Sequence, residues 1–119
     1  MADSVETFFD AWKEEDAKTR LAMISSAVIE SVRYSDPRTP EPLIGTEALN
    51  TYLGMFSDNA PGWSAKVLKS DVTEDVTRVT VEFGGPGPDG SHKVQLGQYF
   101  IEKKGDLVSR MVGFVGTGE

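Results

Sequence analysis

The chain has 119 residues, a formal net charge of -7 and no cysteine. This length corresponds to about one domain and is enough to bury a core without covalent cross-links. The lack of cysteine excludes disulfides, thiolate nucleophiles and cysteine-based metal sites, and it fits a reducing cytoplasm. With 19 acidic against 12 basic residues, the chain would repel a phosphate backbone, so nucleic acid is not an expected partner.

Residues 1–16 lack the basic start and the apolar run of a signal peptide. No stretch approaches the ~20 apolar residues that a helix needs to cross a bilayer. We therefore expect a soluble, cytoplasmic protein with no membrane partner. No linker or repeat divides the sequence, which predicts a single domain over residues 1–119.

Two helices are predicted at the start of the chain. Asp3 followed by Glu6 is typical of a helix N-terminus, where the aspartate side chain accepts free backbone N–H groups. The first helix then shows apolar residues at helical spacing: Val5, Phe8, Phe9 and Trp12. A second helix is expected from about Asp16, with one apolar side: Ala17, Leu21, Ile24 and Val28.

From Val28 the pattern alternates as in a strand, which places Tyr34 and Asp36 on one face. The Asp36-Pro37 step ends this strand, because the residue before proline favours extended geometry and proline has no N–H to donate. A third helix is expected to begin at Gly45-Thr46-Glu47, with a stripe at helical spacing: Leu49, Tyr52, Leu53 and Phe56.

The rest of the chain predicts four strands separated by turn sequences: residues 63–70, 76–83, 92–103 and 107–115. On the third of these strands we expect one set of residues to point inward: Val94, Leu96, Gln98 and Phe100. The other set should point outward: Lys93, Gln95, Tyr99, Ile101 and Lys103. This order predicts an α+β fold with helices on one face of an antiparallel sheet.

Three segments, VRYSDP, LIGTEAL and LVSRMVGFVG, resemble the nuclear transport factor 2-like superfamily, and within it SnoaL-like polyketide cyclases and ketosteroid isomerases. The resemblance covers Val5 to Gly116. It implies a cone-shaped, cystatin-like α+β barrel, in which three N-terminal helices are wrapped by a strongly curved antiparallel sheet around an apolar pocket for a small hydrophobic molecule. It also implies a homodimer formed through the outer sheet face, where we expect Gln95, Tyr99 and Ile101.

The resemblance gives Asp36 the position of a general base that shuttles a proton. A carboxylate beside an apolar cavity suits this role, because desolvation favours its neutral form. Alternatively, Asp36 forms a turn and caps the proline-rich loop that follows it. Ketosteroid isomerases also use two oxyanion donors, and Phe9 and Gln98 occupy those positions here. Phe9 has no proton to donate, and Gln98 can donate only as an amide.

The other candidate residues each have two interpretations. Gln98 is either a ligand contact or a structural amide bonded to a neighbouring strand, and Tyr34 either orients a ligand oxygen or is an ordinary strand-end tyrosine. Two or three aromatic residues are expected to line the pocket while the rest form the core: Phe9, Trp12, Tyr52, Phe56, Trp63 and Phe100. Arg110 either faces inward toward Asp36 or lies in solvent on the outer face.

Nothing in the sequence predicts a metal or nucleotide cofactor, because paired histidines and phosphate-binding loops are missing. The single histidine, His92, follows a turn and should be exposed. Two functions remain. One is a cofactor-independent isomerase, cyclase or lyase, with Asp36 as general base and Gln98 and Tyr34 holding an oxyanion. The other is a non-catalytic ligand-binding or dimeric scaffold domain that uses the same pocket.

Overall fold

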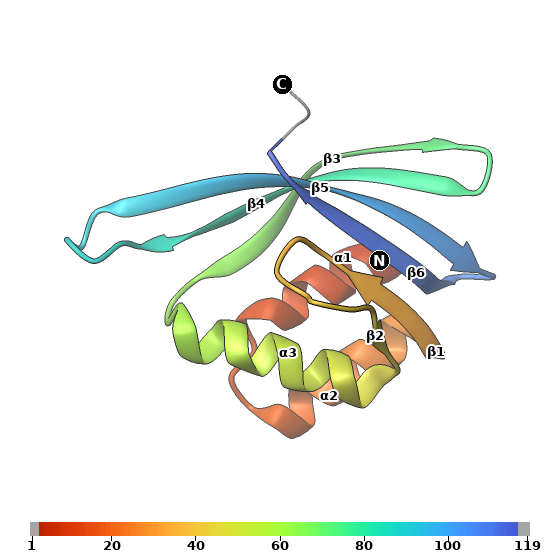
Figure 1. Ribbon diagram of the computed structural model, residues 1–119, viewed down its shortest axis with the longest axis horizontal. Helices are drawn as coiled ribbons and strands as arrows, with labels where there is room; N and C mark the ends of the chain where they lie inside the picture. The colour runs from red at the N-terminus through yellow and green to blue at the C-terminus, as the bar shows by residue number, and fades with distance from the viewer. Residues whose placement is uncertain (1–2, 117–119) are drawn as a thin grey trace.

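A computed structural model describes residues 3–116 and shows a curved six-stranded sheet lying over a layer of helices (Figure 1). The elements follow in chain order: α1 Ser4–Asp10, the 3-10 helix η1 Ala11–Lys13, α2 Ala17–Ala27, β1 Val28–Ser35, β2 Leu43–Ile44, α3 Thr46–Asn59, β3 Ser64–Thr73, β4 Val76–Pro86, β5 His92–Lys104 and β6 Leu107–Val115. The predicted α+β fold class is confirmed. Within residues 3–116, no helix is both long enough and apolar enough to cross a bilayer.

The sheet has the strand order β2-β1-β6-β5-β4-β3. Strands β3 to β6 form an antiparallel meander, as predicted, but β1 pairs with β6 in parallel. The expectation of a wholly antiparallel sheet is therefore wrong at this one pair. A parallel pair needs a long connection, and here α3 and the other strands of the meander supply it. The sheet is also open, with β2 and β3 as its edges, so it is a curved wall and not a closed barrel.

The two N-terminal helices begin where the capping residues predict. The Asp3 side chain accepts from the Glu6 N–H over 2.9 Å, and that of Asp16 accepts from the Thr19 N–H over 2.9 Å. The predicted apolar stripe of the first helix is buried against the sheet: Val5, Phe8, Phe9 and Trp12. These side chains pack between the helices and the inner face of the sheet.

The predicted stripe of α2 is wrong at its start, because Ala17 is exposed and Arg20 is only 6% exposed. Arg20 Nε donates to Asn50 Oδ1 over 2.7 Å, and Nη1 donates to the carbonyl of Glu14 over 2.9 Å. A Cβ at Gly54 would lie 2.7 Å from Arg20 Nη2, so glycine makes room for the guanidinium. This buried arginine joins α2 to α3.

The predicted facing of β5 is also wrong. Tyr99 is 4% exposed and Ile101 is fully buried, whereas Val94 is 50% and Phe100 is 39% exposed. A Cβ at Gly113, the cross-strand partner of Tyr99, would lie 2.5 Å from the Tyr99 ring. The glycine therefore opens the inner face of β6 to the Tyr99 ring, and the alternation of β5 follows from this contact.

Candidate functional site

Asp36 lies one residue beyond β1, and its two carboxylate oxygens accept different sets of hydrogen bonds. Oδ2 accepts hydrogen bonds from the hydroxyls of Tyr34 and Tyr52, both over 2.6 Å. Oδ1 accepts from the backbone N–H groups of Arg38 at 2.8 Å and Thr39 at 3.1 Å. The two interpretations of Asp36 are thus compatible in geometry, because one oxygen caps the loop while the other holds two phenols.

A third phenol extends this arrangement. The hydroxyl of Tyr99 lies 2.9 Å from that of Tyr34. A phenol has one proton, and Tyr34 gives its proton to the carboxylate, so Tyr99 must be the donor to Tyr34. The result is a chain of donors from Tyr99 to Tyr34 to Asp36, joined by Tyr52 from the other side. We call these four residues the Asp36 cluster, and it contains all three tyrosines of the sequence.

The phenols of the cluster are held in their neutral form. Burial raises the pKa of Tyr34 well above its ordinary value, and the negative charge of Asp36 adds to the effect. Burial likewise raises the pKa of Tyr99. For Tyr52, burial is again the first cause of a raised pKa, followed by the hydrogen bond that its hydroxyl donates to Asp36. All three phenols therefore keep their protons throughout the physiological range.

A cavity of about 480 Å³ opens beside the cluster. Asp36, Tyr52 and Tyr99 border it, while Tyr34 lies behind them and is fully buried. The remaining wall is rich in aromatic rings: Trp12, Phe56, Trp63 and Phe83. The cavity therefore has one polar wall, formed by the Asp36 cluster, within a largely apolar surface.

Two tryptophans of this wall are fixed by their surroundings. Trp63 Nε1 donates to the Pro86 carbonyl over 2.9 Å, and a Cβ at Gly85 would lie 2.5 Å from the Trp63 ring. Trp12 packs edge-on against Phe56 and Phe83, with ring centroids 5.0 and 5.3 Å away. The glycine-rich segment before the β4–β5 turn thus leaves room for a ring of the cavity wall.

Four of the aromatic residues that the sequence proposed as ligand contacts border the cavity: Trp12, Tyr52, Phe56 and Trp63. Phe9 is instead buried in the core, with its ring centroid 4.9 Å from that of Tyr99. The expectation that Gln98 and Phe100 face inward is wrong, because the facing of β5 is reversed.

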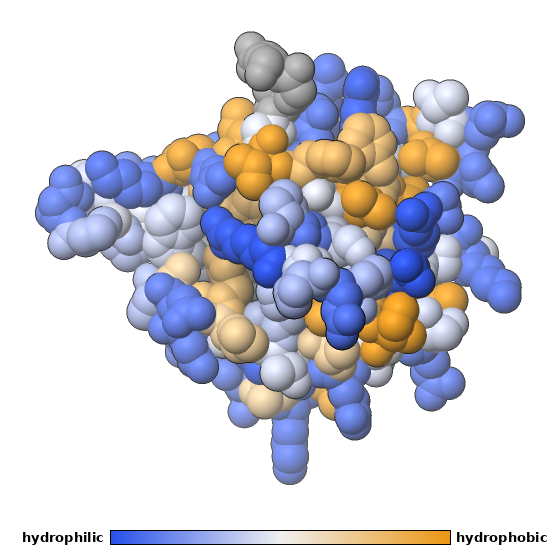
Figure 2. Space-filling view, viewed as in Figure 1, coloured by the Kyte–Doolittle hydropathy of each residue, from blue (hydrophilic) through white to orange (hydrophobic). Residues whose placement is uncertain are grey.

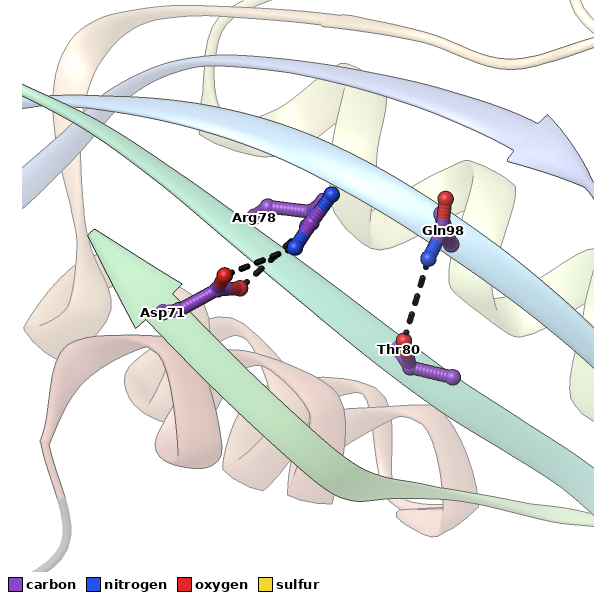
Figure 3. Close-up of polar contacts among 4 residues, drawn as sticks. All are labelled: Asp71, Arg78, Thr80 and Gln98. Carbon is purple, nitrogen blue, oxygen red and sulfur yellow. Dashed lines mark hydrogen bonds and ion pairs between the residues drawn. The ribbon is translucent and has the colours of Figure 1, made fainter. Parts of the chain in front are cut away.

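Gln98 lies on the outer face, where its Nε2 donates to Thr80 Oγ1 over 3.3 Å (Figure 3). It therefore bonds to a neighbouring strand, which is the structural alternative for this amide. Arg110 is half exposed and lies 3.5 Å from Glu102, so it takes the outer-face position and does not approach Asp36. His92 is exposed, as predicted.

The sequence pattern did not identify Tyr99 and Phe83 as residues of the site. The alternation of β5 does not indicate that Tyr99 faces inward, because both faces of this strand carry apolar residues. The available signal is Gly113 on β6, the cross-strand partner of Tyr99, where a Cβ would lie 2.5 Å from the Tyr99 ring.

The sequence matches no protein-family model and no curated protein. Solved structures, however, share the fold over nearly the whole chain. One is a SnoaL-like family protein from Agrobacterium tumefaciens strain C58 that is proposed to be an isomerase, with a TM-score of 0.81, 23% identity, and 96% of this chain and 95% of that chain covered. The chain has a SnoaL-like fold.

Two further structures support the same fold. A protein from Jannaschia sp. CCS1, proposed to be a SnoaL-like polyketide cyclase, has a TM-score of 0.72 and 15% identity, with 94% of this chain and 84% of that chain covered. A protein with a ketosteroid isomerase-like fold from Catenulispora acidiphila, solved with trimethylamine, has a TM-score of 0.74 and 11% identity, with 95% and 85% covered. The resemblance read from the sequence is thus confirmed at the level of the fold, which hosts several activities.

Proposed function

We propose that this domain binds a small, largely apolar molecule in the cavity and holds a polar group of that molecule against the Asp36 cluster. The cavity of about 480 Å³ falls within the range of ~300–1,000 Å³ that is typical of small-molecule sites. The observation that carries the proposal is the placement of one carboxylate and two phenols in a wall that is rich in aromatic rings. Such a wall combines apolar area for affinity with a few polar atoms for orientation.

The intrinsic fluorescence of the protein provides a direct test, because its two tryptophans, Trp12 and Trp63, both border the cavity. Titration with 4-phenylcyclohexanol should change the emission in a saturable manner. The variant Ala60→Leu, which fills part of the cavity, should weaken this binding. The matched control is Ala22→Leu, the same substitution at an exposed position of α2, which should bind as the wild type does. Equal binding by both variants would argue against the cavity as the site.

A second candidate function is a cofactor-independent isomerase or lyase with Asp36 as general base. It is supported by the position of Asp36 at an apolar cavity and by fold relatives that are proposed to be an isomerase and a polyketide cyclase. A carboxylate has about four lone-pair positions, and the four donors to Asp36 occupy them. A base must free one of these, and Tyr52, which is only partly buried, is the donor best able to move.

We also propose that the protein forms a homodimer through the outer face of the sheet. The three residues expected on this face do not lie there, since Tyr99 and Ile101 point inward and Gln95 borders the cavity. Apolar side chains are nevertheless exposed on this face, where Phe100 packs against Phe114 with centroids 5.7 Å apart. Apolar surface runs along the sheet layer above the helices in the space-filling view (Figure 2). Exposed aromatic residues of this kind support an interface.

A further inference from the structure

The Asp36 cluster leaves its wall of the cavity with hydrogen-bond acceptors and no free phenolic proton. Tyr52 gives its only proton to Asp36, and Tyr99 gives its only proton to Tyr34. The Asp36 carboxylate already accepts four hydrogen bonds from the protein, so what it adds to the wall is its negative charge. Burial raises the pKa of both phenols that border the cavity, so this arrangement of protons persists over the physiological range. What the wall can offer a ligand is therefore oxygen lone pairs and negative charge.

The other hydrogen-bond donors of the cavity wall are already bonded, are buried, or lie on exposed side chains at the rim. The Trp63 N–H is bonded to the Pro86 carbonyl. Trp12 Nε1 has no hydrogen-bond partner among the described residues, but this atom is buried, so a ligand in the cavity does not reach it. Arg38, Asn59 and Gln95 border the cavity with exposed side chains. A ligand group that meets the Asp36 cluster is therefore matched to it only if that group brings its own proton.

The charge and the aromatic surface of the cavity wall indicate which class of ligand it favours. Asp36 is the single carboxylate among the residues that border the cavity, and aromatic rings surround it. Aromatic faces attract cations, most strongly where water is excluded. The net charge of -7 also favours the approach of cations. Arg38 is the opposing charge at the rim, and it weakens this preference without removing it because its side chain is exposed to solvent.

We propose that the cavity selects an apolar molecule that carries a protonated amine, and that the ammonium group lies against the Asp36 cluster. This inference rests on the binding function proposed above and specifies its ligand class. A ketone of the same shape is disfavoured, because its oxygen would face the lone pairs of the Tyr52 and Tyr99 hydroxyls and the negative charge of Asp36, with no proton between them. An alcohol, which has a proton but no charge, is intermediate.

The test uses three probes of one shape at pH 7: 4-phenylcyclohexylamine, 4-phenylcyclohexanol and 4-phenylcyclohexanone, each titrated into the wild type by calorimetry. The ammonium form should bind ~10-fold or more tightly than the ketone, with the alcohol between them. Binding of the ketone as tight as that of the amine would overturn this inference while leaving the proposed binding function intact. Failure of all three probes to bind would overturn both.

Substitutions in the cavity wall test which residues cause the preference for the amine over the ketone. Asp36→Asn should reduce the affinity for the amine by ~10-fold and change that for the ketone by less than ~3-fold. Arg38→Gln keeps the backbone N–H that caps Asp36 and should strengthen amine binding by up to ~5-fold.

If Asp36→Asn does not fold, Tyr52→Phe tests the proposal in its place. This variant retains the carboxylate and frees one of its lone pairs, so amine binding should be retained or strengthened. An amine preference that survives Asp36→Asn, or that is lost in Tyr52→Phe, contradicts the proposal. Ala22→Leu serves as the control.

Discussion

The hydroxyl of Tyr34 donates to Asp36 Oδ2 over 2.6 Å, although the two residues are only two positions apart in the chain. A strand places residues i and i+2 on the same face, so this contact follows from local geometry. Tyr34 is fully buried and also accepts from Tyr99, which makes it the central member of the Asp36 cluster.

Removal of the Tyr34 hydroxyl should therefore cost more stability than removal of the Tyr52 hydroxyl. Tyr34→Phe leaves the buried Tyr99 hydroxyl without its acceptor, and we expect the free energy of unfolding to fall by about 1–3 kcal/mol. Tyr52→Phe removes one donor at a partly exposed position and should cost about 0.5–1.5 kcal/mol. Urea denaturation of both variants checks this order, and equal or reversed losses would contradict the assignment of Tyr34 as the centre.

The raised pKa of each tyrosine predicts an unusual alkaline titration. All three tyrosines of the chain belong to the Asp36 cluster. While the protein is folded, absorbance at 295 nm should show no phenol that titrates near the ordinary pKa of about 10. Phenolate should instead form when the protein unfolds. A tyrosine titrating near pH 10 in the native protein would show that the cluster is open to solvent.

The same pKa shifts make stability dependent on alkaline pH. In the folded state the pKa of each phenol is higher than in the unfolded state, so the neutral phenols favour folding. This contribution is fully present below a pH of about 10 and is lost as the pH rises from there through the folded pKa values. The melting temperature should therefore fall more steeply above pH 10 in the wild type than in Tyr34→Phe.

The helices and most of the sheet could be predicted because their signals are local. Asp3 and Asp16 mark helix starts through hydrogen bonds to residues three positions away. The pairing of β1 with β6 joins residues such as Tyr34 and Met111, far apart in the chain, and no local period reports such a contact. The burial of Arg20 likewise depends on Asn50 and Gly54 of another helix.

The site was predicted where one residue type was decisive and missed where the facing of a strand was ambiguous. Asp36 precedes a proline at the end of a strand, which limits its geometry. On β5, Phe100 and Ile101 are both apolar, so hydrophobicity alone could not choose the inner face. The choice is made by Gly113, which lies opposite Tyr99 on the neighbouring strand.

Isomerisation of a 5-ene-3-keto steroid should be very weak or absent. The two positions that would supply oxyanion donors do not face the cavity, since Phe9 is in the core and Gln98 is on the outer face. Loss of one such donor typically costs ~100- to 1,000-fold in rate. An assay of the wild type against Asp36→Asn checks this expectation. Turnover near that of a dedicated isomerase, abolished by the substitution, would show that the phenols of the cluster act as the oxyanion donors.

The proposed dimer should depend on the outer sheet face. Sedimentation velocity at tens of micromolar protein should show a dimer for the wild type and a monomer for Phe100→Lys, which places a charge in the apolar contact with Phe114. Ile44→Lys, at an exposed position on edge strand β2, is the matched control and should remain dimeric. A monomeric wild type would rule out this assembly at that concentration.

The central claim is that the cavity beside the Asp36 cluster is a ligand site, and a crystal structure with 4-phenylcyclohexylamine tests it most directly. The structure should show the rings of the probe between Trp12 and Trp63, with the nitrogen within ~4 Å of Asp36 or of the Tyr52 and Tyr99 hydroxyls. An empty cavity with the probe bound elsewhere, or a probe with its nitrogen directed away from Asp36, would contradict the account.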